Sequence, residues 1–167
     1  MSSDFSQALT DGARQLHIEF SPVQQQLLLD YLALLHKWNR AYNLTAVRDP
    51  AQMLNRHLLD SLSIASLVQG QRVLDVGTGP GLPGIPLAIL FPERQFELLD
   101  SNGKKTRFLI EARAQLGLRN VEVHCDRVEA LCDERGFDAI TSRAFASLAD
   151  MAQGCEHLLA PGGKMFA

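Results

Sequence analysis

Apolar residues recur at spacings of three and four along the first part of the chain, which predicts helices there. The clearest stripe consists of Leu28, Tyr31, Leu32, Leu35 and Trp38. Ser21-Pro22 marks the start of that helix, because serine caps a helix and proline fits its first turn. Gln24 completes a capping box with Ser21. We therefore predict a long amphipathic helix that begins at residue 22.

A second group of helical signals follows. Asp49-Pro50 repeats the combination of cap and proline, and we expect a short helix from there toward Asn55. A separate helix is expected over residues 57–67, ending before Gly70. Residues 1–70 are therefore interpreted as an N-terminal helical extension.

The pattern changes at Gln71, where short apolar runs begin to alternate with helical stretches. Strands are expected over residues 72–76, 95–99, 121–124, 137–141 and 164–167. Helices are expected over residues 82–91, 104–116 and 148–159. Strands that alternate with helices predict an α/β fold with a doubly wound parallel sheet. We assign this domain to residues 71–167.

The composition fits an ordinary globular protein, with 46% hydrophobic residues and a net charge of −3. That charge gives no overall attraction to nucleic acid or to an anionic membrane. The N-terminus lacks the apolar core of a signal peptide, and no window approaches the ~20 apolar residues of a membrane span. Cys125, Cys132 and Cys155 form no CxxC pair, and the histidines are scattered. We expect a cytoplasmic monomer with reduced thiols and no metal site.

The first expected strand runs directly into a glycine-rich loop, Gly77-Thr78-Gly79-Pro80-Gly81. Glycine permits positive φ and lets a ligand lie against the main chain. The carboxyl end of the first strand is also where doubly wound sheets bind ligands. A dinucleotide fold needs a third glycine at the position of Leu82, whereas the G-x-G-x-G spacing resembles the loop of class I methyltransferases, which use S-adenosylmethionine. Glycines that serve only a turn are the alternative.

Further residues suit the same cofactor. Asp100 ends the second expected strand 23 residues after Gly77, where a carboxylate can accept both ribose hydroxyls, unless it only caps a helix. Asp126-Arg127-Val128-Glu129 follows the third strand, where such methyltransferases surround the adenine, although a solvated turn would look the same. Asp75 is expected to hold the glycine loop or the methionine ammonium.

Several segments resemble the RsmG family, also called GidB, and the most specific is the run VLDVGTGPGLPGIPL from Val73 to Leu87. The other matching segments are Trp38-Asn39, Tyr42-Asn43-Leu44-Thr45, Arg56-His57-Leu58-Leu59-Asp60-Ser61, Leu98-Leu99-Asp100-Ser101, Arg127-Val128-Glu129, Ser142-Arg143-Ala144 and Gly162-Gly163-Lys164. Members of this family methylate N7 of a guanine in the 16S ribosomal RNA of the bacterial small subunit. The resemblance implies a cofactor site that includes Gly77, Leu82, Val128, Glu129 and Arg143.

The resemblance also implies a Rossmann-like class I methyltransferase sheet of seven strands. Only five strands are counted before Ala167. An end within an apolar strand would leave an unpaired edge, which proteins avoid. We therefore expect the α/β domain to be truncated, with the last strands missing.

The implied reaction limits which catalytic residues are needed. Guanine N7 has a lone pair and no proton, so its methylation requires orientation rather than a general base. No catalytic residue is therefore assigned. Arg143, after the fourth strand, is a positioning candidate, with a surface ion pair as the alternative. His57 and Asp60 are two more, although at i and i+3 they could instead form a structural polar pair that joins the helices to the cofactor domain.

Local charge is compatible with 16S rRNA, or the small ribosomal subunit, as the partner. Residues 37–56 hold four Lys or Arg residues against one acidic residue, and residues 103–119 hold five against one. Such clusters bind phosphates, although basic helix faces are also common as solvated surface. Three other hypotheses remain. They are a methyltransferase for a small molecule or a protein, a non-catalytic RNA-binding or cofactor-binding module, and a dehydrogenase, which Leu82 disfavours.

Overall fold

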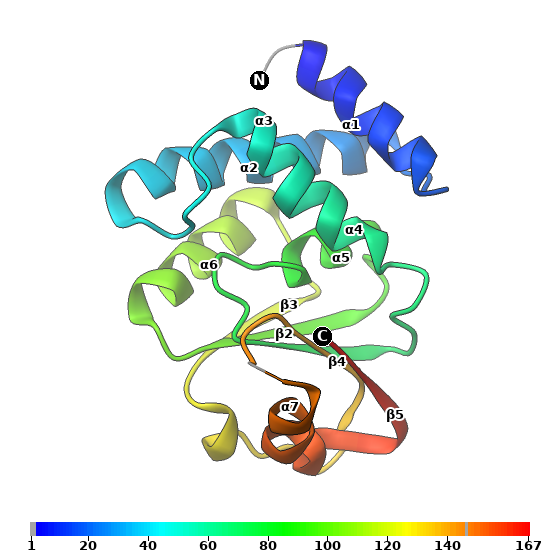
Figure 1. Cartoon of the computed structure of the whole chain (residues 1–167), viewed down its shortest axis with the longest axis vertical. Helices are drawn as coiled ribbons and strands as arrows, with labels where there is room; N and C mark the ends of the chain where they lie inside the picture. Colours follow the sequence, from blue (N-terminus) through cyan, green and yellow to red (C-terminus); the bar gives the residue numbers. More distant parts are fainter. Residues whose placement is uncertain (1–2, 146) are drawn as a thin grey trace.

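A computed structural model describes residues 3–145 and 147–167 of the chain. Five strands form one parallel sheet in the order β3-β2-β1-β4-β5 (Figure 1). The strands are β1 (Arg72–Val76), β2 (Gln95–Asp100), β3 (Val121–Cys125), β4 (Phe137–Ser142) and β5 (Leu159–Phe166). The predicted α/β fold with a parallel sheet is confirmed.

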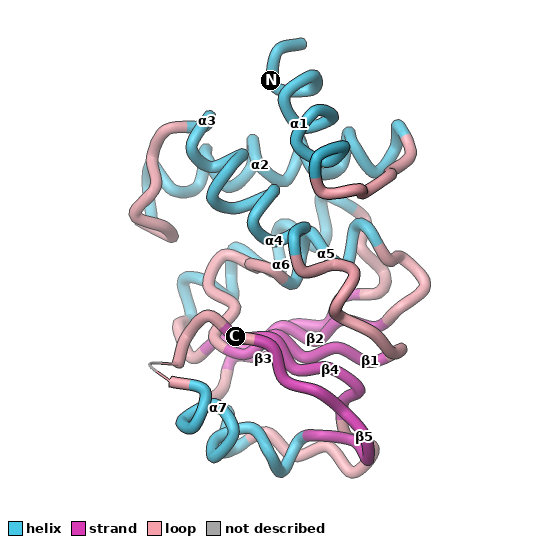
Figure 2. The backbone as a smooth tube through the Cα atoms, turned by 45° about the vertical axis from the view of Figure 1, so that its right-hand side comes forward, coloured by secondary structure: helices cyan, strands magenta, loops and turns pink. Residues whose placement is uncertain are grey.

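Helices cover both faces of this sheet (Figure 2). Helices α5 (Gly84–Leu90) and α6 (Gly103–Leu116) pack on one face, and α7 (Leu148–Cys155) packs on the other. A 3₁₀ turn over Glu156–Leu158 completes the segment that was predicted to be helical up to residue 159. Because both faces of β1 are buried from Val73 onward, these residues form an apolar run that only Asp75 interrupts.

The N-terminal helices form a further layer above α5 and α6 (Figure 1). They are α1 (Ser3–Gln15), α2 (Pro22–Tyr42) and a helical segment from Pro50 to Ser63. The predicted capping box at the start of α2 is present, since Ser21 and Gln24 exchange two hydrogen bonds. Within the described residues, each helix is too short or too polar to cross a membrane.

One apolar core joins the N-terminal helices to the sheet. Phe108 of α6 is fully buried, and its ring lies 6.3 Å from that of Tyr31 and 5.6 Å from that of Trp38, measured between centroids. The same core continues through Val73 on β1. Residue 70 therefore marks a change of secondary structure, and the packing is continuous across it.

Two predicted helices turn out to be one. The segment runs without a break through α3 (Pro50–Met53), a π-helical turn (Leu54–Leu59) and α4 (Asp60–Ser63). A π-helical turn contains more residues than an α-helical turn, so it interrupts the spacing of three and four on which the prediction relied. The expected break near Asn55 was wrong for this reason. The expected end at residue 67 was also wrong, because the helix ends at Ser63.

The last strand is longer than predicted. It begins at Leu159, five residues before the expected start at Lys164. Pro161-Gly162-Gly163, which precedes the expected start, lies inside β5 at an irregularity in the pairing with β4. Gly162 has φ = +79°, a conformation that glycine adopts without strain.

Replacing Phe108 with alanine should test the link between the helices and the sheet. The lost ring would leave a cavity between α2 and α6, so we expect the free energy of unfolding to fall by about 3–5 kcal/mol. Urea denaturation of the full-length protein measures this change. Ile110→Ala on the same helix is the matched control, because Ile110 is 57% exposed and its loss should change stability by ~0.5 kcal/mol or less.

Candidate active site

The glycine loop leaves the carboxyl end of β1 with three residues at positive φ. These are Gly77 at +63°, Gly79 at +60° and Gly81 at +98°. Space as well as conformation requires glycine at position 77, because an added Cβ there would lie 2.2 Å from the Cβ of Ala144. The loop after β4 therefore packs directly against the main chain of Gly77.

A buried carboxylate holds the loop from below. Asp75 Oδ2 accepts hydrogen bonds from Thr78 Oγ1 at 2.6 Å and from the Gly84 N–H at 2.8 Å. Its Oδ1 accepts a third from Thr141 Oγ1 of β4 at 3.1 Å. Burial raises the pKa of Asp75 to about 6, although these hydrogen bonds act in the opposite direction.

Two other groups hold the top of the loop. The Gly79 N–H donates to Asp100 Oδ2 at 2.8 Å, and the Tyr31 hydroxyl donates to the Pro80 carbonyl oxygen at 2.8 Å. Tyr31 is fully buried and belongs to α2. Helix α6 is capped by Asn102, so the interpretation of Asp100 as only a helix cap is wrong.

A polar cavity of about 560 Å³ opens beside this loop. Its lining consists of Val76, Gly77, Leu99, Asp100, Ser101, Lys105, Asp126, Arg127, Val128, Glu129, Arg143, Ala144 and Phe145. Five of the predicted cofactor residues are brought together there, namely Gly77, Asp100, Val128, Glu129 and Arg143. The acidic and basic side chains of the lining are equal in number.

The other four predicted cofactor residues do not line this cavity. Asp75 lies fully buried beneath the loop. Gly79 and Gly81 shape the loop, and a Cβ at Gly81 would lie 2.6 Å from Ile85. Leu82 is buried in the core with the apolar residues of α5. In this structure these four residues contact the loop or the core.

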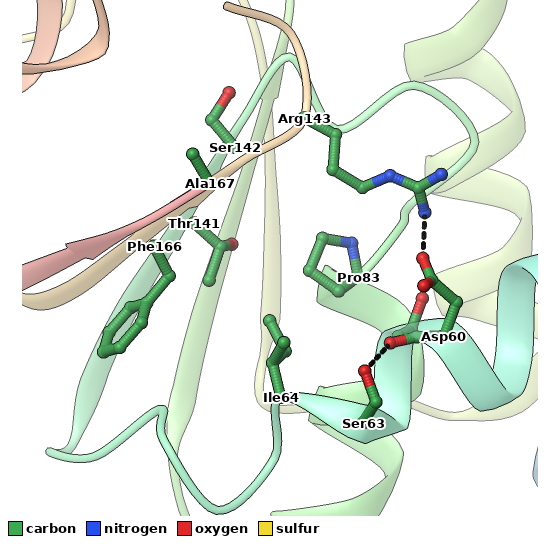
Figure 3. A pocket seen from close by; sticks show the side chains of 10 residues that line it. Asp60, Ser63, Ile64, Pro83, Thr141, Ser142, Arg143, Phe166 and Ala167 are labelled. Atoms are coloured by element: carbon green, nitrogen blue, oxygen red, sulfur yellow. Dashed lines mark hydrogen bonds and ion pairs between the residues drawn. The ribbon is translucent and has the colours of Figure 1, made fainter. Parts of the chain in front are cut away.

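A smaller cavity of about 240 Å³ adjoins the first (Figure 3). It is lined by Asp60, Ser61, Ser63, Ile64, Pro83, Thr141, Ser142, Arg143, Phe166 and Ala167. Arg143 belongs to both linings, and its Nη1 lies 3.2 Å from Asp60 Oδ2. This ion pair links α4 to the segment that follows β4.

His57 and Asp60 do not form the polar pair that their spacing suggested. His57 Nε2 lies 2.9 Å from Thr45 Oγ1, whereas Asp60 pairs with Arg143. His57 is only 5% exposed, and burial lowers its pKa. It connects the helical segment to the loop after α2, while Asp60 is the one of the two that faces a cavity.

Sequence reasoning missed several residues of the two cavities and of the loop. Tyr31 was assigned to an apolar stripe, and nothing in that pattern indicates that its hydroxyl reaches Pro80. Ser61 and Phe166 line the smaller cavity, and Lys105 lines the larger one. For Ser61 a signal did exist, because it follows Asp60 in a segment that carries the family resemblance.

One group of potential metal ligands lies away from both cavities. Glu97, Glu122 and His124 have ligand atoms within 4.8 Å of one another on β2 and β3. Glu97 accepts from Arg72 Nη2 at 2.8 Å and contacts His124 Nε2 at 2.8 Å. The hydrogen bond between them raises the pKa of His124 and lowers that of Glu97. These contacts make Glu97 the centre of an ion-pair network that joins three strands.

The family profile of GidB, described as rRNA small subunit methyltransferase G, matches residues 24–167. The chain belongs to this family. The protein named ribosomal RNA small subunit methyltransferase G from Hydrogenovibrio crunogenus is 63% identical over 140 residues, covering 84% of this chain and 65% of that protein. The protein of the same name from Ectopseudomonas mendocina is 59% identical over 155 residues, covering 92% of this chain and 72% of that protein. The chain thus spans about two thirds to three quarters of the length of these relatives.

Solved structures of methyltransferases have a fold similar to that of this chain. A methyltransferase from Geobacter sulfurreducens, solved with S-adenosyl-L-homocysteine, matches with a TM-score of 0.54 at 16% identity, covering 80% of this chain and 53% of that one. Coclaurine N-methyltransferase matches with a TM-score of 0.56 at 15% identity, and the match covers 97% of this chain and 58% of that one. At these identities the likeness concerns the fold, and it confirms the predicted class I methyltransferase sheet.

Tyr31→Phe should weaken binding at the glycine loop without unfolding the protein. The change removes one hydroxyl and leaves the Pro80 carbonyl without its buried donor. We expect affinity for S-adenosylmethionine to fall about three- to tenfold, as measured by calorimetry on the full-length protein. Tyr42→Phe on the same helix is the control, since Tyr42 is 43% exposed. Equal affinities for the two variants would show that the Tyr31 hydroxyl does not support the loop.

Asp75→Asn should change how stability depends on pH. Since the folded state raises the pKa of Asp75 from 3.8 to about 6, the protonated carboxyl favours folding, and that contribution is lost as the pH rises through 6. The stability of the wild type relative to Asp75→Asn should therefore fall by about 2 kcal/mol between pH 4 and pH 7. Urea unfolding at several pH values measures this difference. A difference that stays constant over this range would contradict the raised pKa.

Proposed function

We propose that this protein transfers a methyl group from S-adenosylmethionine to N7 of a guanine in 16S ribosomal RNA. The main support is that two cavities meet at Arg143, at the carboxyl edge of a methyltransferase sheet. One is large enough for a nucleoside cofactor, and the other offers an adjoining place for a single base. Family membership supports the same substrate, because the relatives are named for the small-subunit rRNA.

The residues of the larger cavity fit S-adenosylmethionine. Its volume of about 560 Å³ lies within the range of ~300–1,000 Å³ that small-ligand sites occupy. Gly77 presents bare main chain at a point where a side chain would clash with Ala144. Asp100 offers a carboxylate suited to ribose hydroxyls, and Val128 offers an apolar side chain suited to the adenine.

The smaller cavity suits the acceptor base. Its volume of about 240 Å³ falls below the usual range for drug-sized ligands. It combines the apolar side chains of Ile64, Pro83 and Phe166 with hydroxyl and charged groups. Figure 3 shows Phe166 and Asp60 on opposite sides of this space. Such a mixture of flat apolar and polar contacts is how proteins bind single unstacked bases.

For this reaction the main task of the protein is to orient the two reactants. When bound, S-adenosylmethionine supplies a methyl group on a sulfonium, and its transfer to the N7 lone pair breaks the carbon–sulfur bond with the electron pair going to sulfur. Since no proton leaves N7, the site needs no general base. The glycine loop, Asp100 and Arg143 instead fix the two reactants relative to each other, and orientation alone can lower a barrier by ~7–11 kcal/mol.

Basic side chains on and just after α6 can hold the RNA backbone. Within the described residues, the five Lys and Arg residues between positions 103 and 119 form no ion pair. One of them, Lys105, also lines the larger cavity. Unpaired cations next to a binding site bind phosphates in a salt-dependent way. The chain's net charge of −3 therefore coexists with a local basic region.

Methyl transfer to unmodified RNA tests the proposal. The full-length protein is incubated with 16S rRNA transcribed in vitro and S-adenosylmethionine labelled in its methyl group. We expect the label in 7-methylguanosine after nuclease digestion. Label that appears in another nucleoside, or in material that resists RNase, would contradict the proposed substrate.

Gly77→Ala should abolish this activity by pushing apart Gly77 and Ala144, which both line the larger cavity. The added Cβ meets Ala144, and φ = +63° is strained for alanine, so we expect cofactor affinity to fall by about 100-fold or more. Gly103→Ala is the matched control, because a Cβ there meets no atom within 4 Å. Calorimetry with S-adenosylmethionine compares the two variants. If Gly77→Ala binds as well as Gly103→Ala, the cofactor does not lie against this main chain.

A further inference from the structure

Asp60 lines the smaller cavity from the helical side and has spare hydrogen-bonding capacity. Its side chain is 57% exposed, and its one ion pair within the described residues is the 3.2 Å contact with Arg143. Exposed pairs of this kind contribute only ~0–1 kcal/mol, so a ligand can rearrange the pair at small cost. Asp60 also directly follows the π-helical turn Leu54–Leu59, a type of irregularity that is frequent at functional sites.

A second, independent feature indicates that this cavity receives a polar ligand. Ser61 is 2% exposed and lines the cavity, and its Oγ has no hydrogen-bond partner among the described residues. Buried polar atoms are nearly always paired in folded proteins. Ser63 and Ser142 line the same cavity, but their hydroxyls already donate to the carbonyl oxygens of Asp60 and Val76. Ser61 Oγ is therefore a polar group of the lining that protein contacts leave available.

We infer that Asp60 reads the Watson–Crick edge of the target guanine, with Arg143 donating to its O6. This inference rests on the proposed function. Guanine presents N1–H and N2–H as neighbouring donors, and an ionised carboxylate is an acceptor with two oxygens. The O6 acceptor lies beside N1, where the guanidinium paired with Asp60 can reach it. Adenine presents an acceptor at N1 and donors at N6, so it is mismatched to both side chains.

The same contact favours the reaction at N7. In guanine, N7 lies on the far side of the ring from N1 and N2. A base held at Asp60 therefore turns N7 away from α4, toward the end of β4, where Thr141 and Ser142 line the cavity and Arg143 borders the cofactor cavity. Methylation leaves the ring positively charged, which makes N1–H more acidic. The hydrogen bond to Asp60 then strengthens as the reaction proceeds, and such an interaction raises kcat.

Internal competition between guanosine and inosine tests this reading. Inosine lacks the N2 amino group but keeps N1–H, O6 and N7. The full-length protein is given 16S rRNA transcribed with inosine in place of a small fraction of guanosine, and the methylated nucleosides are measured by mass spectrometry. For the wild type we expect methylation of inosine to be about tenfold lower than its share of the RNA predicts. For Asp60→Ala we expect methylation to follow that share.

Comparing kcat with cofactor affinity shows whether Asp60 contacts the base or has only a structural role. Asp60→Asn keeps the shape of the side chain but removes its charge, and it should lower kcat roughly 10- to 100-fold. Its affinity for S-adenosylmethionine, measured by calorimetry, should stay within about twofold of the wild type. Asp11→Asn is the matched control, because it breaks a similarly exposed ion pair, with Arg14 at 3.3 Å, on the distant helix α1.

The possible outcomes distinguish this inference from the function on which it rests. If the wild type forms no 7-methylguanosine, both the proposed function and the reading by Asp60 fail. If the wild type is active but methylates inosine and guanosine equally, only the reading by Asp60 is overturned. The same holds if Asp60→Ala keeps the preference for guanosine, or if Asp60→Asn and Asp11→Asn have equal kcat.

Discussion

The Asp75 carboxylate fixes the part of the sheet on which both cavities depend. It accepts hydrogen bonds from Thr78 in the glycine loop, Gly84 at the start of α5 and Thr141 on β4. A buried carboxylate is costly to desolvate, and three donors offset much of that cost. The result is that the loop, the helix and the neighbouring strand share one rigid anchor.

The two cavities lie on either side of this anchored region and are formed by different residues. The loop and Asp100 form one cavity, and Asp60 with the end of β4 forms the other. Arg143 borders both, so it is the side chain best placed to sense occupancy of either one. The proposed reaction moves a positive charge from the larger cavity to the smaller one. Asp60 lines the smaller cavity and Arg143 lies at the boundary, so the negative charge is on the side where the positive charge develops.

The sequence was sufficient to predict the sheet, because its strands are short apolar runs separated by clear turns. β1 was predicted over the same residues that the structure shows, and Asp100 was placed correctly at the end of β2. The errors have local causes. The π-helical turn at Leu54–Leu59 breaks the helical period, and Pro161-Gly162-Gly163 resembles a turn although it lies within β5. The neighbours Asp60 and Ser61 meet Phe166 only in the folded chain, so the sequence could not reveal the smaller cavity.

The hydrogen bond from Tyr31 to Pro80 ties the N-terminal helices to the glycine loop of the proposed cofactor site. Thermodynamic coupling is reciprocal, so a ligand whose binding strengthens this hydrogen bond also strengthens the attachment of α2 to the rest of the molecule. Such a ligand would act on a helix that contributes no residue to the lining of either cavity. A layer added on top of an ordinary α/β domain can in this way report whether the domain beneath it is loaded.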